Sequence, residues 1–137
     1  MASEPHTQTL RTCSAPQCLE SIHGLLARLW ADASEVGAED RIRFETAVAE
    51  VAANIVEHAA AGAIVDLSVE VRAYPDRVEA LFCDTGAPAD VDLDSASLPD
   101  DMAESGRGLA IARAAVDEVV YERDGGVNRW RVTRLRA

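Results

Sequence analysis

Polar side chains recur every four positions in the segment TAVAEVAANIVEH, at Thr46, Glu50, Asn54 and His58. An α-helix has about 3.6 residues per turn, so this spacing places the four on one narrow stripe. A carboxylate and an amide then lie one turn apart on the same side. Asn competes for backbone hydrogen bonds inside a helix, so its presence on the stripe asks for a reason. A solvated helix face with one unfavourable Asn is the plainer interpretation of this segment alone.

A second candidate is the segment DTGAP, which runs from Asp84 to Pro88 and follows the apolar stretch 77–83. A carboxylate at the end of a buried strand can accept a hydrogen bond from an amino group, such as the exocyclic amine of adenine. Gly86 would let a flat base approach the backbone. The pattern Asp-x-Gly-x-Pro is also a common turn, and taken alone it favours the turn.

A third candidate is Gly106-Arg107-Gly108, a glycine-flanked turn that opens directly into a predicted helix at Leu109. Free N–H groups and the positive end of the helix dipole attract anions there, and glycine lets a phosphate come close. Arg107 would add positive charge. As an isolated motif this is weak, because ordinary loop-to-helix junctions have the same sequence.

The elements that must position these residues follow from periodicity. We expect strands over residues 7–12, 64–72, 77–83, 119–123 and 127–135, and helices over 16–32, 40–62 and 109–117. The blocks and their two hairpins predict an α+β fold. Its form would be a two-layer α/β sandwich, with a mixed, mostly antiparallel sheet covered by helices on one face.

Each of the first two helices has an apolar face. The first would bury Leu19, Ile22, Leu25, Leu26 and Leu29, and the second Phe44, Val48, Val51, Ile55 and Ala59. Asp40 is expected as the N-cap of the second helix. The acidic segment 87–105 is long for a loop in a compact domain and is expected to be an active-site lid.

Composition narrows the function. With 137 residues the chain fits one domain, which we expect over 7–137 after a flexible tail at 1–6. A net charge of −11 argues against nucleic acid or an anionic membrane as partner. All 13 basic residues are Arg, so Gly-Lys-Ser/Thr phosphate loops and Schiff-base chemistry are excluded.

The cysteines and the N-terminus indicate the compartment. Cys13, Cys18 and Cys83 have no Cys-x-x-Cys spacing, which argues against a disulfide framework or a zinc site. The N-terminal segment lacks a basic-then-apolar signal, and no apolar run is long enough to span a membrane. We therefore expect a cytoplasmic protein.

The three motifs, here called boxes, are the stripe of Glu50 and Asn54, the segment from Asp84 to Pro88, and Gly106-Arg107-Gly108. In order and spacing they together resemble the GHKL ATP-binding fold shared by gyrase, heat-shock chaperones, histidine kinases and mismatch-repair ATPases. They are most similar to its small stand-alone branch, the anti-sigma-factor serine kinases. The resemblance covers about residues 7–135. Each box alone is unspecific, but the combination is not.

The resemblance implies roles for the helical stripe. Glu50 matches the family's catalytic carboxylate, a general base towards a partner's serine hydroxyl. Asn54 matches the ligand of Mg²⁺, an ion that needs few protein ligands because phosphates and water complete its octahedron. His58 matches a histidine common in this branch and is taken as orienting or structural.

The other two boxes would hold the nucleotide. The resemblance makes Asp84 the adenine-binding aspartate, with Gly86 supporting the base. It makes Gly106 and Gly108 the phosphate-binding glycines, with Arg107 between them.

Two positions depart from the family pattern. His23 stands where the first helix is expected to carry an Arg for the partner surface, which puts partner choice in doubt. The last strand is entered through Gly126-Val127-Asn128 instead of Gly-Thr, so adenine contacts there cannot be transferred.

The resemblance implies a serine kinase that uses ATP and Mg²⁺, phosphorylates an antagonist protein of the STAS type, binds a sigma factor and forms a homodimer. A non-catalytic, nucleotide-dependent protein-binding switch is the alternative. The ATP-binding half of a histidine kinase is a third interpretation. It is weaker because the chain has no helix pair with a phosphoacceptor His.

Overall fold

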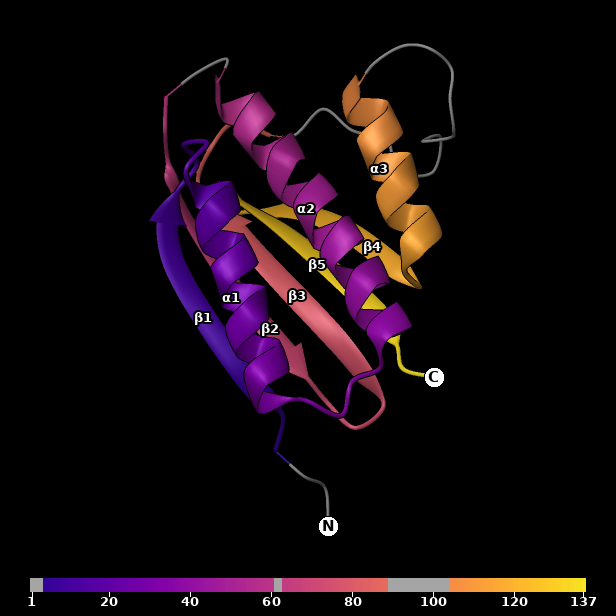
Figure 1. The fold of residues 1–137 in the computed structure, drawn as a ribbon. Helices are drawn as coiled ribbons and strands as arrows, with labels where there is room; N and C mark the ends of the chain where they lie inside the picture. Colours follow the sequence, from indigo (N-terminus) through magenta and orange to yellow (C-terminus); the bar gives the residue numbers. More distant parts are fainter. Residues whose placement is uncertain (1–3, 61–62, 89–103) are drawn as a thin grey trace.

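The computed structural model describes residues 4–60, 63–88 and 104–137. Figure 1 shows three helices and five strands in these ranges. Their order is β1 (His6–Cys13), α1 (Cys18–Asp32), α2 (Ala38–Ala60), β2 (Asp66–Ala73), β3 (Arg77–Asp84), α3 (Glu104–Ala115), β4 (Glu118–Asp124) and β5 (Val127–Leu135). Every predicted element is present, within five residues at each end. The predicted lid at 87–105 falls mainly outside the described residues.

The five strands form one sheet in the order β1-β2-β3-β5-β4, and each neighbouring pair is antiparallel. All three helices lie on one face of this sheet (Figure 1). The predicted α+β fold with helices on one face is therefore confirmed. None of the described helices is both long enough and apolar enough to span a bilayer.

The core lies between the sheet and the helices. Alternate residues of β2 and β3 are buried, and they point to the helices because successive side chains of a strand face opposite ways. Phe44 of α2, Phe82 of β3 and Trp130 of β5 are among the largest buried side chains. Burying one side chain of this size contributes about 1.5–3 kcal/mol, so this layer fixes α2 against the sheet.

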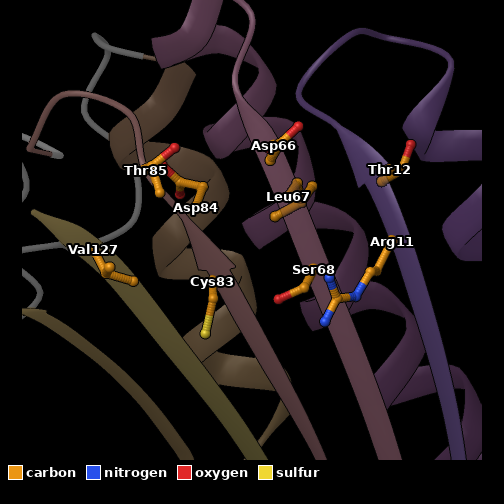
Figure 2. Close-up of a pocket in the computed structure, with 9 residues that line it drawn as sticks. All are labelled: Arg11, Thr12, Asp66, Leu67, Ser68, Cys83, Asp84, Thr85 and Val127. Carbon is orange, nitrogen blue, oxygen red and sulfur yellow. The ribbon is translucent and has the colours of Figure 1, made fainter.

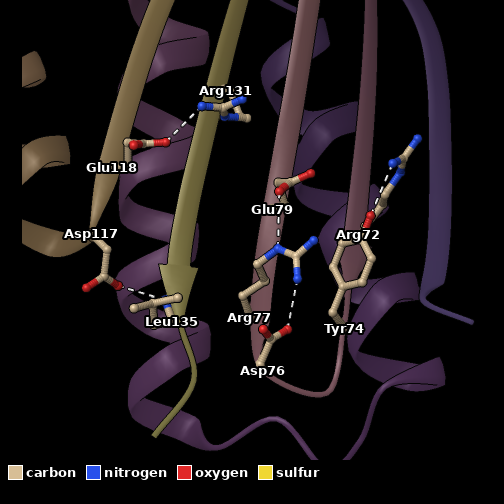
Figure 3. Close-up of polar contacts among 9 residues, drawn as sticks. All are labelled: Arg72, Tyr74, Asp76, Arg77, Glu79, Asp117, Glu118, Arg131 and Leu135. Carbon is tan, nitrogen blue, oxygen red and sulfur yellow. Dashed lines mark hydrogen bonds and ion pairs between the residues drawn. The ribbon is translucent and has the colours of Figure 1, made fainter. Parts of the chain in front are cut away.

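The other face of the sheet is polar (Figure 3). Arg77 Nε lies 3.4 Å from Glu79 Oε2, and Arg131 Nη2 lies 2.9 Å from Glu118 Oε1. Pairs of this kind, of which Arg77–Glu79 is partly buried and Arg131–Glu118 exposed, add little stability, but they mark a face without helices. A buried polar site must therefore be sought on the helix side.

Two predicted details of the helices are wrong. Leu19 is 38% exposed because Cys18, one residue earlier, takes the inward position in the first turn of α1. Asp40 is not the N-cap, because α2 begins two residues before it at Ala38. The Asp40 carboxylate instead accepts hydrogen bonds from Arg134 Nε at 2.9 Å and from the Ala137 N–H at 3.1 Å, which fastens the end of the chain to α2.

Candidate functional site

The polar stripe of α2 lies beside its buried face and not on a solvated face, because Asn54 is 3% exposed. Thr46 bonds within α2, because its hydroxyl donates to the Ile42 carbonyl at 2.8 Å, one turn back. The side chain of His58 lies outside the described residues. Glu50 and Asn54 remain, one turn apart on a helix held by the core.

Asn54 is 3% exposed, and within the described ranges neither its Oδ1 nor its Nδ2 has a hydrogen-bond partner. A buried polar atom without a partner costs about 1–3 kcal/mol. An unpartnered amide oxygen is a suitable hard ligand for Mg²⁺, so this residue fits the predicted metal role. The described residues contain no group of three or more His, Cys, Asp or Glu side chains that could hold a metal. Phosphate and water would have to complete the coordination of an ion at Asn54.

Glu50 is partly buried, and this burial raises the pKa of its carboxyl above the ordinary value. Desolvation disfavours the charged form, so the carboxylate holds a proton more readily than it would in water. A raised pKa brings a carboxylate closer to the range in which it works as a general base at neutral pH. The raised pKa of Glu50 is compatible with the predicted role, which stays a prediction.

The predicted turn Gly106-Arg107-Gly108 is not a turn, because α3 already begins at Glu104. Gly106 lies in the first turn of α3, where backbone N–H groups have no acceptor within the helix, whereas Gly108 lies further in. A Cβ added at Gly108 would come 2.5 Å from Glu50 Oε2. Glycine is therefore what lets α3 approach the Glu50 carboxylate.

Asp84 ends β3 and points to the helix side, with 6% exposure. Its Oδ1 accepts a hydrogen bond from the Gly86 N–H at 2.8 Å, which closes the predicted turn. A Cβ at Gly86 would lie 3.0 Å from the same oxygen, tighter than ordinary contact. Glycine at this position therefore leaves room for the Asp84 carboxylate.

Asn128, the second residue of β5, is a site residue that the sequence motifs did not indicate. It is 3% exposed and lies opposite Asp84 in the β3–β5 pairing. Its Nδ2 donates to Asp84 Oδ1 at 2.9 Å and to the Ala87 carbonyl at 2.8 Å. The departure from Gly-Thr at this position was the available signal, but only strand pairing shows which residue Asn128 meets.

The structure thus brings Glu50 together with Gly108, and Asp84 together with Gly86 and Asn128. A cavity of about 460 Å³ lies at the ends of β2 and β3, and Asp84 and Thr85 are among the residues that line it (Figure 2). Arg11, Ser68 and Cys83 line it on the face without helices, and no lining residue comes from α2. It is distinct from the stripe that carries Glu50 and Asn54.

Comparison with known proteins agrees with this fold. The family model for the histidine kinase-like ATPase domain matches residues 15–134. No curated protein matches the chain. The chain is similar to the crystal structure of the RsbU and RsbW domains of Rv1364c from Mycobacterium tuberculosis, with a TM-score of 0.62 and 19% identity. That match covers 94% of this chain and 33% of the other. The family model spans most of the sequence, so the chain belongs to the histidine kinase-like ATPase family.

Proposed function

We propose that the protein is a regulatory serine kinase that uses ATP and Mg²⁺ to phosphorylate a STAS-type antagonist of an anti-sigma factor, and that it also binds a sigma factor. Membership of an ATPase family makes ATP the nucleotide of the domain. The observation that carries the proposal is the unpartnered, buried amide of Asn54 one turn from Glu50. The likeness to a structure that contains an RsbW domain is consistent with this branch of the fold.

In this proposal Glu50 is the catalytic residue. It accepts the proton of the partner's serine hydroxyl, and burial prepares it by raising its pKa. Asn54 would hold Mg²⁺, which neutralises phosphate charge when bound. Phosphoryl transfer depends mainly on positioning and charge neutralisation, and a base and a metal ligand on one helix would serve these two needs.

The remaining site residues would bind the nucleotide. Asp84 accepts a hydrogen bond from the base, beside the room left by Gly86. Gly106 offers a backbone N–H in the first turn of α3, and Arg107, whose side chain is exposed, adds charge. Gly108 has a second role, because its missing side chain accommodates Glu50.

Partner recognition is the least constrained part of the proposal. The antagonist must present a serine to Glu50, and the sigma factor and a second copy of the chain need further surfaces. His23 stands on the exposed side of α1, where a partner would meet it. A cytoplasmic location suits all of these partners.

A nucleotide-dependent binding switch without catalysis is the second candidate. One observation favours it, namely the close approach of α3 to the Glu50 carboxylate at Gly108. In such a switch, nucleotide binding would change the α2–α3 contact and so the surface offered to a partner, without transfer.

The test has two stages. Thermal unfolding with and without ATP and Mg²⁺ reports binding, since a ligand at about a hundred times its dissociation constant stabilises the fold by about 2.7 kcal/mol. Transfer of radiolabel from ATP to candidate STAS domains then reports catalysis. Binding with transfer supports the kinase, and binding without transfer to any antagonist supports the switch. No stabilisation of a folded protein would contradict both.

A further inference from the structure

Asn128 occupies a buried position between the predicted base-binding turn and the β4–β5 hairpin. In the sheet it lies opposite Asp84 of β3 on one side and opposite Arg123 of β4 on the other. With 3% exposure it is as buried as the hydrophobic core around it. A polar side chain at such a place needs partners for both ends of its amide.

Both ends are satisfied, and the partners fix which end is which. The Nδ2 side faces acceptors only, because it lies 2.8 Å from the Ala87 carbonyl and 3.3 Å from the Gly86 carbonyl. The Oδ1 side faces donors, the Tyr121 hydroxyl at 2.5 Å and Arg123 Nη1 at 2.9 Å. An arginine can only donate and a carbonyl can only accept, so the amide has one orientation.

This orientation of the Asn128 amide determines how the Asp84 carboxylate is oriented. Asp84 Oδ1 accepts from Asn128 Nδ2 at 2.9 Å and from the Gly86 N–H at 2.8 Å. Two donors on one oxygen hold the plane of the carboxylate. Within the described ranges, both hydrogen bonds to the Asp84 carboxylate end on Oδ1 and none ends on the other oxygen, Oδ2.

Arg123 strengthens the same arrangement from outside. Its Nη1 also donates to the Gly86 carbonyl at 2.9 Å, so the turn after β3 is held from β4 as well as from β5. Asn128 itself has no unused polar atom to offer a ligand, since its amide nitrogen and oxygen are both engaged.

We propose that Asn128 is the positioning residue for base recognition: it turns Asp84 so that Oδ2 accepts a hydrogen bond from the exocyclic amine of adenine, without touching the base itself. The inference rests on the proposed ATP site and deepens it. It concerns how the base is selected, not whether phosphate is transferred.

A purely structural role for Asn128 would also weaken nucleotide binding when the residue is changed. The two roles differ in what they do to base selection. ATP and purine riboside 5′-triphosphate, which lacks the 6-amino group, share every phosphate and ribose contact. Loss of a positioning residue weakens ATP selectively, whereas general damage to the turn weakens both nucleotides alike.

The experiment is calorimetric titration of both nucleotides, with Mg²⁺ present, into wild type, Asn128→Ala, Arg123→Ala and Arg129→Ala. Wild type should prefer ATP by about tenfold or more, as expected for a hydrogen bond to a carboxylate. Asn128→Ala should reduce this preference to below about threefold, chiefly through ATP, and Arg123→Ala should reduce it about two- to threefold. Arg129 is exposed on the opposite face of β5, so its variant is the matched control and should keep the full preference.

Three results would overturn the inference. Equal weakening of both nucleotides by Asn128→Ala would leave only a structural role, and an unchanged preference would leave no role in selection. Wild type that does not distinguish the two nucleotides would remove base recognition by Asp84, while transfer from ATP to a partner would still decide the proposed kinase. If Asn128→Ala does not fold, the preference of Arg123→Ala decides between the two roles, since the Arg123 side chain is exposed.

Discussion

Two asparagines, Asn54 on α2 and Asn128 on β5, are equally buried at 3% exposure but differ in their hydrogen bonding. Asn128 takes part in five hydrogen bonds, with Asp84, Tyr121, Arg123 and two backbone carbonyls. Asn54 has no hydrogen-bond partner within the described ranges. The buried amide at the base end of the proposed site is therefore satisfied by the described protein groups, whereas the buried amide at the metal end is not.

The difference has an energetic meaning. A satisfied buried amide stabilises the folded chain modestly, whereas an unsatisfied one destabilises it by about 1–3 kcal/mol for each orphan group. A residue that costs stability at a buried position is best explained by a ligand that completes it. The hydrogen bonds around Asn128 are thus formed without a ligand, whereas the Asn54 amide needs a ligand to be satisfied. Substitutions can test this difference.

The largest effect is expected at Glu50, which lies one turn from the unsatisfied Asn54. Glu50→Gln should reduce transfer to the antagonist serine by about 10²–10⁴-fold, since general bases contribute this much. ATP binding should persist because the amide keeps the size of the side chain. Radiolabel transfer measures the first and thermal stabilisation by ATP the second. Undiminished transfer would remove Glu50 from the catalytic role.

Asn54→Ala should abolish stabilisation by ATP and Mg²⁺, which is about 2.7 kcal/mol for wild type at a hundred times the dissociation constant. Without nucleotide the variant should be no less stable than wild type, because it removes two unsatisfied buried atoms. Denaturant unfolding in both conditions provides the measurement. A variant that still responds fully to ATP would show that the metal site lies elsewhere.

Asn128→Ala should behave in the opposite way without nucleotide. It strips partners from Asp84, Tyr121 and Arg123, so we expect a loss of about 2–3 kcal/mol in the free energy of unfolding. The same denaturant series, run beside Asn54→Ala, makes the two asparagines each other's control. Equal stability losses would break the comparison.

Gly108→Ala tests the contact between α3 and Glu50, and Gly24→Ala is its control. Replacing glycine within a helix should stabilise by about 0.5–1 kcal/mol, and a Cβ at Gly24 has only an ordinary contact at 3.8 Å. At Gly108 the new methyl would displace the Glu50 carboxylate, so we expect this gain to be lost and transfer to fall. A gain equal to that of Gly24→Ala, with full transfer, would show that the contact does not matter.

The smallest effect is the pH dependence that Glu50 confers. Its folded pKa is raised by burial, so its contribution to stability is present at low pH and is lost as pH rises through that pKa. As pH rises from the ordinary range of a glutamate through the raised pKa of Glu50, wild type should therefore lose stability relative to Glu50→Gln. The loss should be small because water still reaches the carboxylate. If wild type instead gained stability relative to Glu50→Gln as pH rises, a raised pKa of Glu50 would be contradicted.

Local pattern predicted much of this molecule. The stripe of Glu50 and Asn54 on one helix follows from spacing of four, and the strand that ends at Asp84 follows from an apolar run before a glycine turn. Both depend on neighbours along the chain, which is why periodicity is informative. α3 begins five residues before the predicted helix, because two glycines in its first turns have the composition of a loop; of the two, Gly108 lies against Glu50 of α2.

Contacts between distant segments could not be predicted in this way. Asn128 meets Asp84 across 44 residues, and Arg134 meets Asp40 across 94. Both contacts depend on strand order and register, which are set by the packing of the whole sheet. The exposure of Leu19 has a related cause, because two adjacent residues compete for one inward position and the packing of α1 buries Cys18 instead.

Local propensity and spacing are enough to predict the helices and strands, their order and the residue types that carry the chemistry. Which polar groups are satisfied depends on the folded arrangement of the chain. It left the Asn54 amide buried without a partner among the described residues, surrounded the Asn128 amide with donors and acceptors, and placed Gly108 against Glu50. Hydrogen-bond satisfaction depends on atoms brought together from distant parts of the chain, so spacing along the sequence does not determine it.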